Sequence, residues 1–332
     1  MPNQIFANAR AAALFSSLLG ADRLGRMIDC ASADEALKIL AEVNFGDGIP
    51  VSSAADFEVL VEAEEKKYTA FVRETCPSER LMRFLLAGYD YHNAEAISRA
   101  KYLKSDFTPM LGAEGEYSVS LLEEKIFADD YTRFSPELSA ALSGADELFV
   151  SGKADGKSIS SLFRRALYKE MKTCAERKKP LKKLFSEKAD AANIAVALRS
   201  RNFALASEMT VDGGTLSEEE IRFLCEEAAE SIREKFRYSP QKDLIFSALD
   251  DFSEGKPLTD FEKKSDGFAL VILKKERYND EGYKPFLRYC YYKLAELANV
   301  KIIMSCLVNG VEKNIIRARL RETYEGQNGY YR

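Results

Sequence analysis

Apolar residues along most of the chain recur at spacings of three and four, which places them on one face of an α-helix. An early example runs through Leu14, Leu18, Leu24, Met27 and Ile28. Sustained strand-type alternation of apolar and polar residues is absent. The pattern predicts an all-α chain.

Turn-forming residues are sparse. Glycine and proline together supply 27 of the 332 residues, about 8% of the chain against roughly 12% in average proteins. Few turns in a chain of this length predict long helices. A hydroxyl residue stands three positions before a glutamate in segments 32–35, 217–220 and 259–262. In such a capping box, both side chains satisfy free backbone N–H groups of the first helical turn, so each segment predicts a helix start.

An acid-x-x-Asn pattern occurs three times, with separations of 100 and 106 residues between the acids. Leucine stands nine positions before each acid, and Ile or Ala stands seven positions after it. Equal spacing with matching flanks predicts three similar helical units of roughly 100 residues, which is longer than a usual solenoid repeat. We expect boundaries at 1–110, 111–213 and 214–332, with N-terminal helices that pack with the C-terminal unit.

The acid and the asparagine of each copy lie on one face of a helix, because residues three positions apart are neighbours there. The two side chains can therefore bond each other or a facing helix. Buried polar groups need hydrogen-bond partners, so we expect buried polar clamps that fix the register of packed helices. The six residues are Asp90, Asn93, Asp190, Asn193, Glu296 and Asn299.

Composition excludes several classes of protein. The chain has 53 acidic and 48 basic residues, a net charge of −5, which disfavours a nucleic-acid binder. Its six cysteines are scattered without a C-x-x-C pair, and His92 is the single histidine, so no zinc ligand set exists and no metal or other cofactor is expected. The longest stretch without a charge, residues 11–21, is shorter than the roughly 20 apolar residues that span a bilayer.

Segment 151–158 imitates a phosphate-binding loop because it ends in Gly156, Lys157 and Ser158. The P-loop pattern needs a glycine where Ser151 stands, and a strand before it. A loop between two helices explains the segment better. No carboxylate pair is marked out as a catalytic acid and base, and we expect His92 to be a hydrogen-bonded core or interface residue, so no catalytic residue is predicted.

Charge is distributed in blocks. Residues 151–188 hold twelve Lys or Arg against four acids, whereas residues 31–65 hold nine acids against one Lys. Such blocks are solvated helix faces or steer charged partners. On charge alone, a partner interface is predicted at basic residues of this block and of the C-terminal segment: Arg164, Arg165, Lys169, Arg177, Arg317, Arg319 and Arg321.

Three stretches together resemble a known family. They are Asn8-Ala9-Arg10 with the helix that follows, Tyr89-Asp90-Tyr91-His92-Asn93 with its second copy at 190–202, and the segment 291–303 closing with Ile316-Arg317-Ala318-Arg319-Leu320. In order and spacing they are similar to the C-type subunits of the V-type and A-type ATPases, whose eukaryotic V-type counterpart is the d-type subunit.

The resemblance implies an all-helical, funnel-shaped protein of three similar domains in a pseudo-threefold arrangement, with no catalytic residues of its own. It implies one copy at the cytoplasmic face of the membrane, peripheral and without a span. The partners it implies are the proteolipid ring and the central-stalk subunits of a rotary ATPase or ATP synthase that moves H⁺ or Na⁺. The alternatives from the residues are a generic helical adaptor and a nucleotide-dependent enzyme built on segment 156–158.

Overall fold

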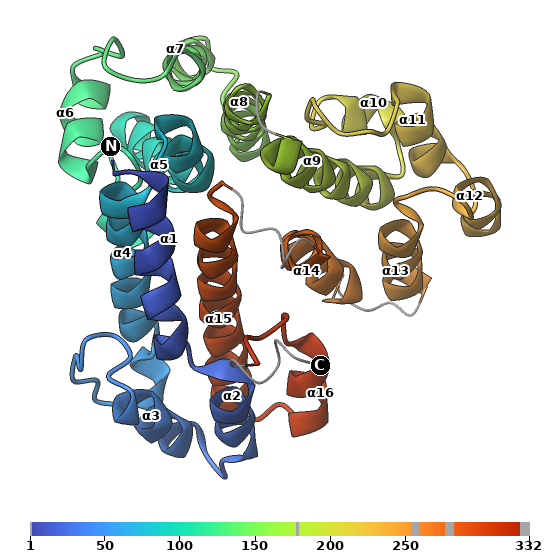
Figure 1. The fold of residues 1–332 in the computed structure, drawn as a ribbon. Helices are drawn as coiled ribbons and strands as arrows, with labels where there is room; N and C mark the ends of the chain where they lie inside the picture. The colour runs from blue at the N-terminus through green and yellow to red at the C-terminus, as the bar shows by residue number, and fades with distance from the viewer. Residues whose placement is uncertain (1, 177–178, 254–258, 276–281, 326–332) are drawn as a thin grey trace. The chain divides into compact units, whose positions relative to one another are not determined.

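Every regular element of the described chain is a helix (Figure 1). The computed structural model describes residues 2–176, 179–253, 259–275 and 282–325, and no strand occurs in these ranges. The all-α prediction is confirmed. The longest helices reach 25 residues, in agreement with the scarcity of turn residues.

The chain divides into two compact units. The first joins the residues up to Ser78 with those from Glu262 onward, and the second comprises Glu79–Phe261. The division into three units of roughly 100 residues stays a prediction.

The first unit brings both ends of the chain to one long helix, α15. Helices α1, α2 and α4 all pack on α15. The core between them includes Leu24, Met27 and Ile28 of the early periodic segment, together with Val300 and Ile303 of α15. Its elements are Gln4–Leu14 (α1), Phe15–Ser17 (η1), Gly20–Asp29 (α2), Ala33–Glu42 (α3), Ala54–Asp56 (η2), Glu58–Thr75 (α4), Lys284–Val308 (α15) and Lys313–Arg319 (α16), with most of Thr259–Lys275 (α14).

The second unit contains two cores, each built on one long helix. One core gathers apolar residues of α5 to α8, such as Phe163, and the other gathers those of α9 to α13, such as Phe236. Both phenylalanines are 1% exposed. The elements are Glu79–Leu103 (α5), Thr108–Met110 (η3), Val119–Phe127 (α6), Pro136–Val150 (α7), Gly156–Ala175 (α8), Lys179–Ser200 (α9), Phe203–Ser207 (α10), Glu218–Glu226 (α11), Ala229–Phe236 (α12) and Lys242–Ser253 (α13).

The capping boxes have different outcomes. Ser217 and Glu220 form the reciprocal pair as predicted, and α11 follows. Ser32 also caps its helix, but the glutamate of that segment accepts from the N–H of Ala31 rather than from that of Ser32.

The third capping box is not the one predicted. Thr259 already belongs to α14, and the N–H groups of Asp260 and Phe261 donate to the carboxylate of Asp251, each at 3.1 Å. A buried aspartate of the preceding helix, 5% exposed, thus accepts from the first-turn N–H groups that the Thr259 hydroxyl was predicted to cap. Tertiary contact has overridden a local signal.

Ser217→Ala should lower the free energy of unfolding by about 1 kcal/mol, because the N–H of Glu220 in the first turn of α11 loses the hydroxyl that accepts from it. Urea denaturation followed by circular dichroism measures the change. Ser207→Ala is the control, since the Ser207 hydroxyl is exposed and donates to Ala204 O within its own helix. Equal effects of the two changes would contradict the capping role.

Candidate functional site

All three acid–asparagine pairs are buried on long helices. The first pair lies on α5, the second on α9 and the third on α15. None of the six side chains is more than 5% exposed: Asp90, Asn93, Asp190, Asn193, Glu296 and Asn299. Polar groups removed from water to this degree must find partners inside the protein.

Each asparagine binds a peptide of the chain that returns along its helix. Asn93 donates to Ala113 O at 3.1 Å and accepts from Gly112 N at 2.8 Å. Asn193 makes both bonds with one residue, donating to Val211 O at 2.9 Å and accepting from Val211 N at 2.8 Å. An amide side chain carries one acceptor and a donor group, so it can pair with a backbone N–H and a backbone C=O as a neighbouring chain does in a sheet.

The third asparagine repeats this geometry. Asn299 donates to Arg321 O at 3.1 Å and accepts from Arg321 N at 2.7 Å. The bound peptides of the three copies therefore lie 18 to 22 residues after their asparagine. We call each asparagine with its bound peptide an asparagine clasp.

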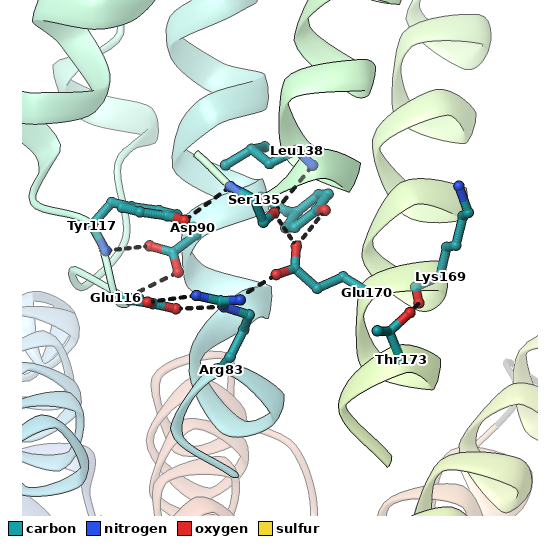
Figure 2. Close-up of polar contacts among 10 residues, drawn as sticks. Arg83, Asp90, Glu116, Tyr117, Ser135, Leu138, Lys169, Glu170 and Thr173 are labelled. Carbon is teal, nitrogen blue, oxygen red and sulfur yellow. Dashed lines mark hydrogen bonds and ion pairs between the residues drawn. The ribbon is translucent and has the colours of Figure 1, made fainter. Parts of the chain in front are cut away.

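The aspartates of the first two copies bind the same returning chain a few residues further on. Asp90 accepts from Glu116 N at 2.9 Å and from Tyr117 N at 3.0 Å (Figure 2). Asp190 accepts from Thr215 N at 2.7 Å and from Leu216 N at 3.1 Å. Two successive N–H groups on one carboxylate form a small anion-binding nest.

A glycine precedes each nest, because the carboxylate leaves no room for a side chain. A Cβ at Gly115 would lie 2.4 Å from Asp90 Oδ1, and one at Gly214 would lie 2.2 Å from Asp190 Oδ1. Three residues after each glycine, Ser118 or the Ser217 described above caps the next helix. The repeated Gly-x-x-Ser, 25 and 24 residues after the acid, is present in the sequence, but sequence reasoning missed it.

The acid of the third copy is held by the other end of the chain. Glu296 accepts from the N–H of Leu19, the residue just before α2, and from Lys293 Nζ at 2.7 Å. Leu19 thus takes the place that Glu116 and Tyr117 have in the first copy. The N–H of Ala21 donates to Tyr324 O at 3.2 Å, which ties the two segments to each other.

Buried charge around Glu296 is balanced by two lysines. Lys293 bonds Glu64 and Glu296, both at 2.7 Å, and Lys67 bonds Glu64 at 2.6 Å. Burial alone would lower the pKa of Lys293, but the two carboxylates raise it above its ordinary value. Burial likewise opposes ionisation of Glu64, yet Lys293 and Lys67 hold its pKa below the ordinary value.

The hydrogen-bond partners of these pairs differ from the predicted ones. The helical spacing suggested that acid and asparagine bond each other or a facing helix, whereas the bonds run to backbone groups of the returning chain. Peptides that leave a helix and enter the core lack ladder partners, and a buried peptide must be satisfied. A clamping role for the six residues stays a proposal.

The segment that imitates a phosphate-binding loop connects α7 and α8, as expected for a loop between helices. Asp155 caps α8 and accepts from Ser158 N at 2.6 Å, while Ser158 Oγ accepts from Asp155 N at 3.0 Å. The helix N-terminus, where a P-loop receives phosphate, is here occupied by a carboxylate.

His92 is not a core residue. It is exposed on α5, and its Nε2 lies 2.8 Å from Met110 O, which can accept only from a protonated ring nitrogen. All six cysteines are free thiols, and all but Cys30 are buried. Among the described residues, no three Cys, His, Asp or Glu side chains converge as metal ligands.

The basic residues predicted for an interface differ in their availability on α8. Arg165 is exposed, and Lys169 is paired with Glu137 at 2.7 Å. Arg164 lies over the ring of Tyr168 at 6.0 Å. Arg177 lies outside the described residues.

The C-terminal arginines are used inside the first unit. Arg317 pairs with Asp29, and Arg321 pairs with Asp266 at 2.7 Å with a side chain only 14% exposed. Arg319 Nη1 lies 3.9 Å from Cys306 Sγ. Their role in binding a partner stays a prediction.

None of the described helices has the length and apolar character that crossing a bilayer requires. Residues 7–319 match the family described as the ATP synthase (C/AC39) subunit. Because the match covers nearly the whole chain, the protein belongs to this family of V-type and A-type ATPase subunits, as the sequence resemblance predicted. A comparison with curated proteins finds no match.

Gly115→Ala and Gly214→Ala should each destabilise the fold, because the new methyl group would displace the aspartate from its nest. We expect a loss of about 2 kcal/mol or more in the free energy of unfolding. Gly88→Ala is the control, since a Cβ there meets no atom within 4 Å and the residue lies inside α5; alanine should be neutral or stabilising there. Denaturant titration compares the three, and equal stabilities would contradict the nest.

Asn93→Leu, Asn193→Leu and Asn299→Leu should each lower the melting temperature. Each change leaves a buried N–H and a buried C=O without their partner, at about 1 to 3 kcal/mol for an unsatisfied group. Differential scanning calorimetry measures the effect, and an unchanged melting temperature would refute the clasp at that position.

Proposed function

We propose that the protein is a non-catalytic central-rotor subunit of a V-type or A-type rotary ATPase. In this role one copy couples the central stalk to the proteolipid ring and transmits torque between ATP chemistry and the transport of H⁺ or Na⁺. Membership in the ATP synthase (C/AC39) subunit family supports the assignment to the complex. The coupling role itself rests on the argument that follows.

The observation that carries the proposal is the set of three asparagine clasps. In each, a buried side chain on a long helix binds one N–H and one C=O of the returning chain. Buried polar contacts with every partner in place rigidify a structure and define one arrangement. A part that passes torque must resist deformation, and these contacts stiffen the helical scaffold at three places.

A non-catalytic role is supported by the hydrogen bonds found at the two candidate sites for chemistry, the segment 156–158 and His92. The carboxylate of Asp155 blocks the helix terminus that a nucleotide phosphate would use, and His92 donates to a main-chain carbonyl. The match to an ATPase accessory family agrees with this interpretation.

We further propose a peripheral position at the cytoplasmic face of the membrane. Exposed basic residues of α8, Arg165 foremost, are candidates for contact with acidic partners, because rim charges steer association.

Affinity capture tests the proposal directly. The tagged protein is recovered from gently solubilised membranes of its own source, and the associated proteins are identified by mass spectrometry. We expect the proteolipid, the stalk subunits and the ATPase head subunits. Recovery of the protein alone, from membranes shown to contain the intact ATPase, would refute the coupling role and favour a generic helical adaptor.

The remaining alternative, a nucleotide-dependent enzyme, has its own test. Isothermal titration calorimetry of the wild-type chain with Mg-ATP should show no binding attributable to residues 156–158. If ATP binds and Lys157→Ala abolishes the binding, the segment is a nucleotide site and the capped helix start described above does not exclude phosphate.

A further inference from the structure

The first acid–asparagine pair has charged neighbours that need explanation. Arg83 of α5 donates to both carboxylate oxygens of Glu116, at 2.8 and 2.9 Å, and its Nε lies 3.4 Å from Glu170 of α8 (Figure 2). Glu116 is also one of the two residues whose N–H groups bind Asp90. Two carboxylates, those of Glu116 and Glu170, therefore contact a single guanidinium, and a third, that of Asp90, is bound to the backbone of Glu116.

These charges do not balance. Asp90 is 2% exposed and Glu170 is 5% exposed. No ion pair joins Asp90 to Arg83 or to any other cation within the described ranges. When all three carboxylates are ionised, two negative charges remain in excess in a place that is largely closed to water. Like charges close together in a protein favour the protonation of one of them.

Other polar groups around the cluster do not supply the missing cation. Glu170 also accepts from the hydroxyls of Tyr91 at 2.7 Å and Ser135 at 2.6 Å. These neutral donors stabilise a charge on Glu170 without cancelling it. The remaining ionisable groups that face the cluster are Arg80, which is exposed, the Tyr117 phenol, the Cys174 thiol of α8 and Glu137 of α7, which is paired with Lys169.

The other two copies are arranged differently. Beside Glu296, the two buried carboxylates contact two lysines, of which Lys67 also pairs with the exposed Asp47 at 2.7 Å. Beside Asp190, the place of the second carboxylate is taken by the neutral amide of Gln241, whose Nε2 donates to Asp190 Oδ2 at 3.1 Å. Glu187, one turn before Asp190, has its pKa raised by burial and by Asp190, and Lys183 acts against this shift.

We propose that the loop 112–117 closes on α5 in a pH-sensitive manner, with proton uptake by Asp90, beside Glu116 and Glu170, holding it shut. Asp90 takes up the proton because it is buried without a cation in contact. Geometry and titration agree, since burial, with smaller contributions from Glu116 and Glu170, raises the pKa of Asp90 to about 7 against the opposing effect of the two backbone N–H groups.

The sign follows from linkage. When the loop lifts away, Asp90 meets water and its pKa returns towards the ordinary value of about 3.9. The closed loop therefore binds the proton more tightly than the open loop, so protons favour closure. Between about pH 4 and about pH 7 the opening constant should rise by up to about tenfold per pH unit, and it should level off above about pH 7.

Amide hydrogen exchange on the whole chain tests this inference. The reporters are the N–H groups of Glu116 and Tyr117, followed from about pH 5 to about pH 8 after correction for the intrinsic pH dependence of exchange. Thr215 and Leu216 in the second copy provide the internal reference. We expect the protection of the first pair to fall at least tenfold relative to the reference as the pH rises, and parallel behaviour of the two loops would overturn the proposal.

Variants separate titration from a merely structural role. Glu170→Gln keeps an acceptor for Tyr91 and Ser135 but removes one negative charge, so the pH midpoint of loop opening should fall. Asp90→Asn should abolish the pH response of the loop. An unchanged midpoint in Glu170→Gln would refute the cluster as the origin of the response.

A gain-of-response variant remains informative if Asp90→Asn does not fold. Gln241→Glu places a second carboxylate beside Asp190 and thereby copies the first arrangement into the second loop. Protection of Thr215 and Leu216 should then decrease with rising pH, as it does for Glu116 and Tyr117. In wild-type protein, infrared spectra should show a protonated carboxyl band that titrates near neutral pH and moves in Glu170→Gln; its absence would overturn the proposal.

Discussion

The structure depends on buried asparagine side chains that form hydrogen bonds which a neighbouring backbone would otherwise supply. Where the chain leaves each long helix and returns along it, it has no sheet or helix ladder to pair with, and an asparagine amide supplies the missing donor and acceptor. The carboxylate one turn earlier then collects one or two N–H groups. Core packing holds the helices together, but these contacts decide where the connecting segments run.

In the third copy, the N–H that binds the acid comes from a segment near the N-terminus and not from the chain that follows the helix. In the first two copies, one stretch of chain supplies both the peptide for the asparagine and the N–H groups for the aspartate. In the third, Arg321 supplies the peptide, and Leu19, which lies 277 residues from Glu296 in sequence, supplies the N–H. Helix α2, which follows Leu19, thus stands in the place that α6 and α11 have after their own capping serines.

Much of this architecture could be predicted from sequence, and the limits have physical causes. Apolar periodicity identified the helical class, and the repeat located six of the buried polar residues, because its acid and asparagine recur three times with matching flanks. Their hydrogen-bond partners could not be predicted, because they are main-chain groups, which nearly every residue has whatever its side chain. The steric role of the glycines at 115 and 214 could not be predicted, because it depends on a carboxylate 25 or 24 residues earlier. The prediction of a capping box at α14 failed for a related reason, since the carboxylate that accepts from its first turn belongs to Asp251 of another helix.

The asparagine clasp recognises a peptide group and is indifferent to the side chain attached to it. The residues held are Gly112 with Ala113, Val211, and Arg321, which have no chemical property in common, and their distances from the asparagine differ by up to four positions. Insertions and deletions can therefore accumulate between helix and clasp while the three-dimensional contact persists. Alignments of related chains, or of the three copies within one chain, should break at these returning loops although the loops are structurally equivalent.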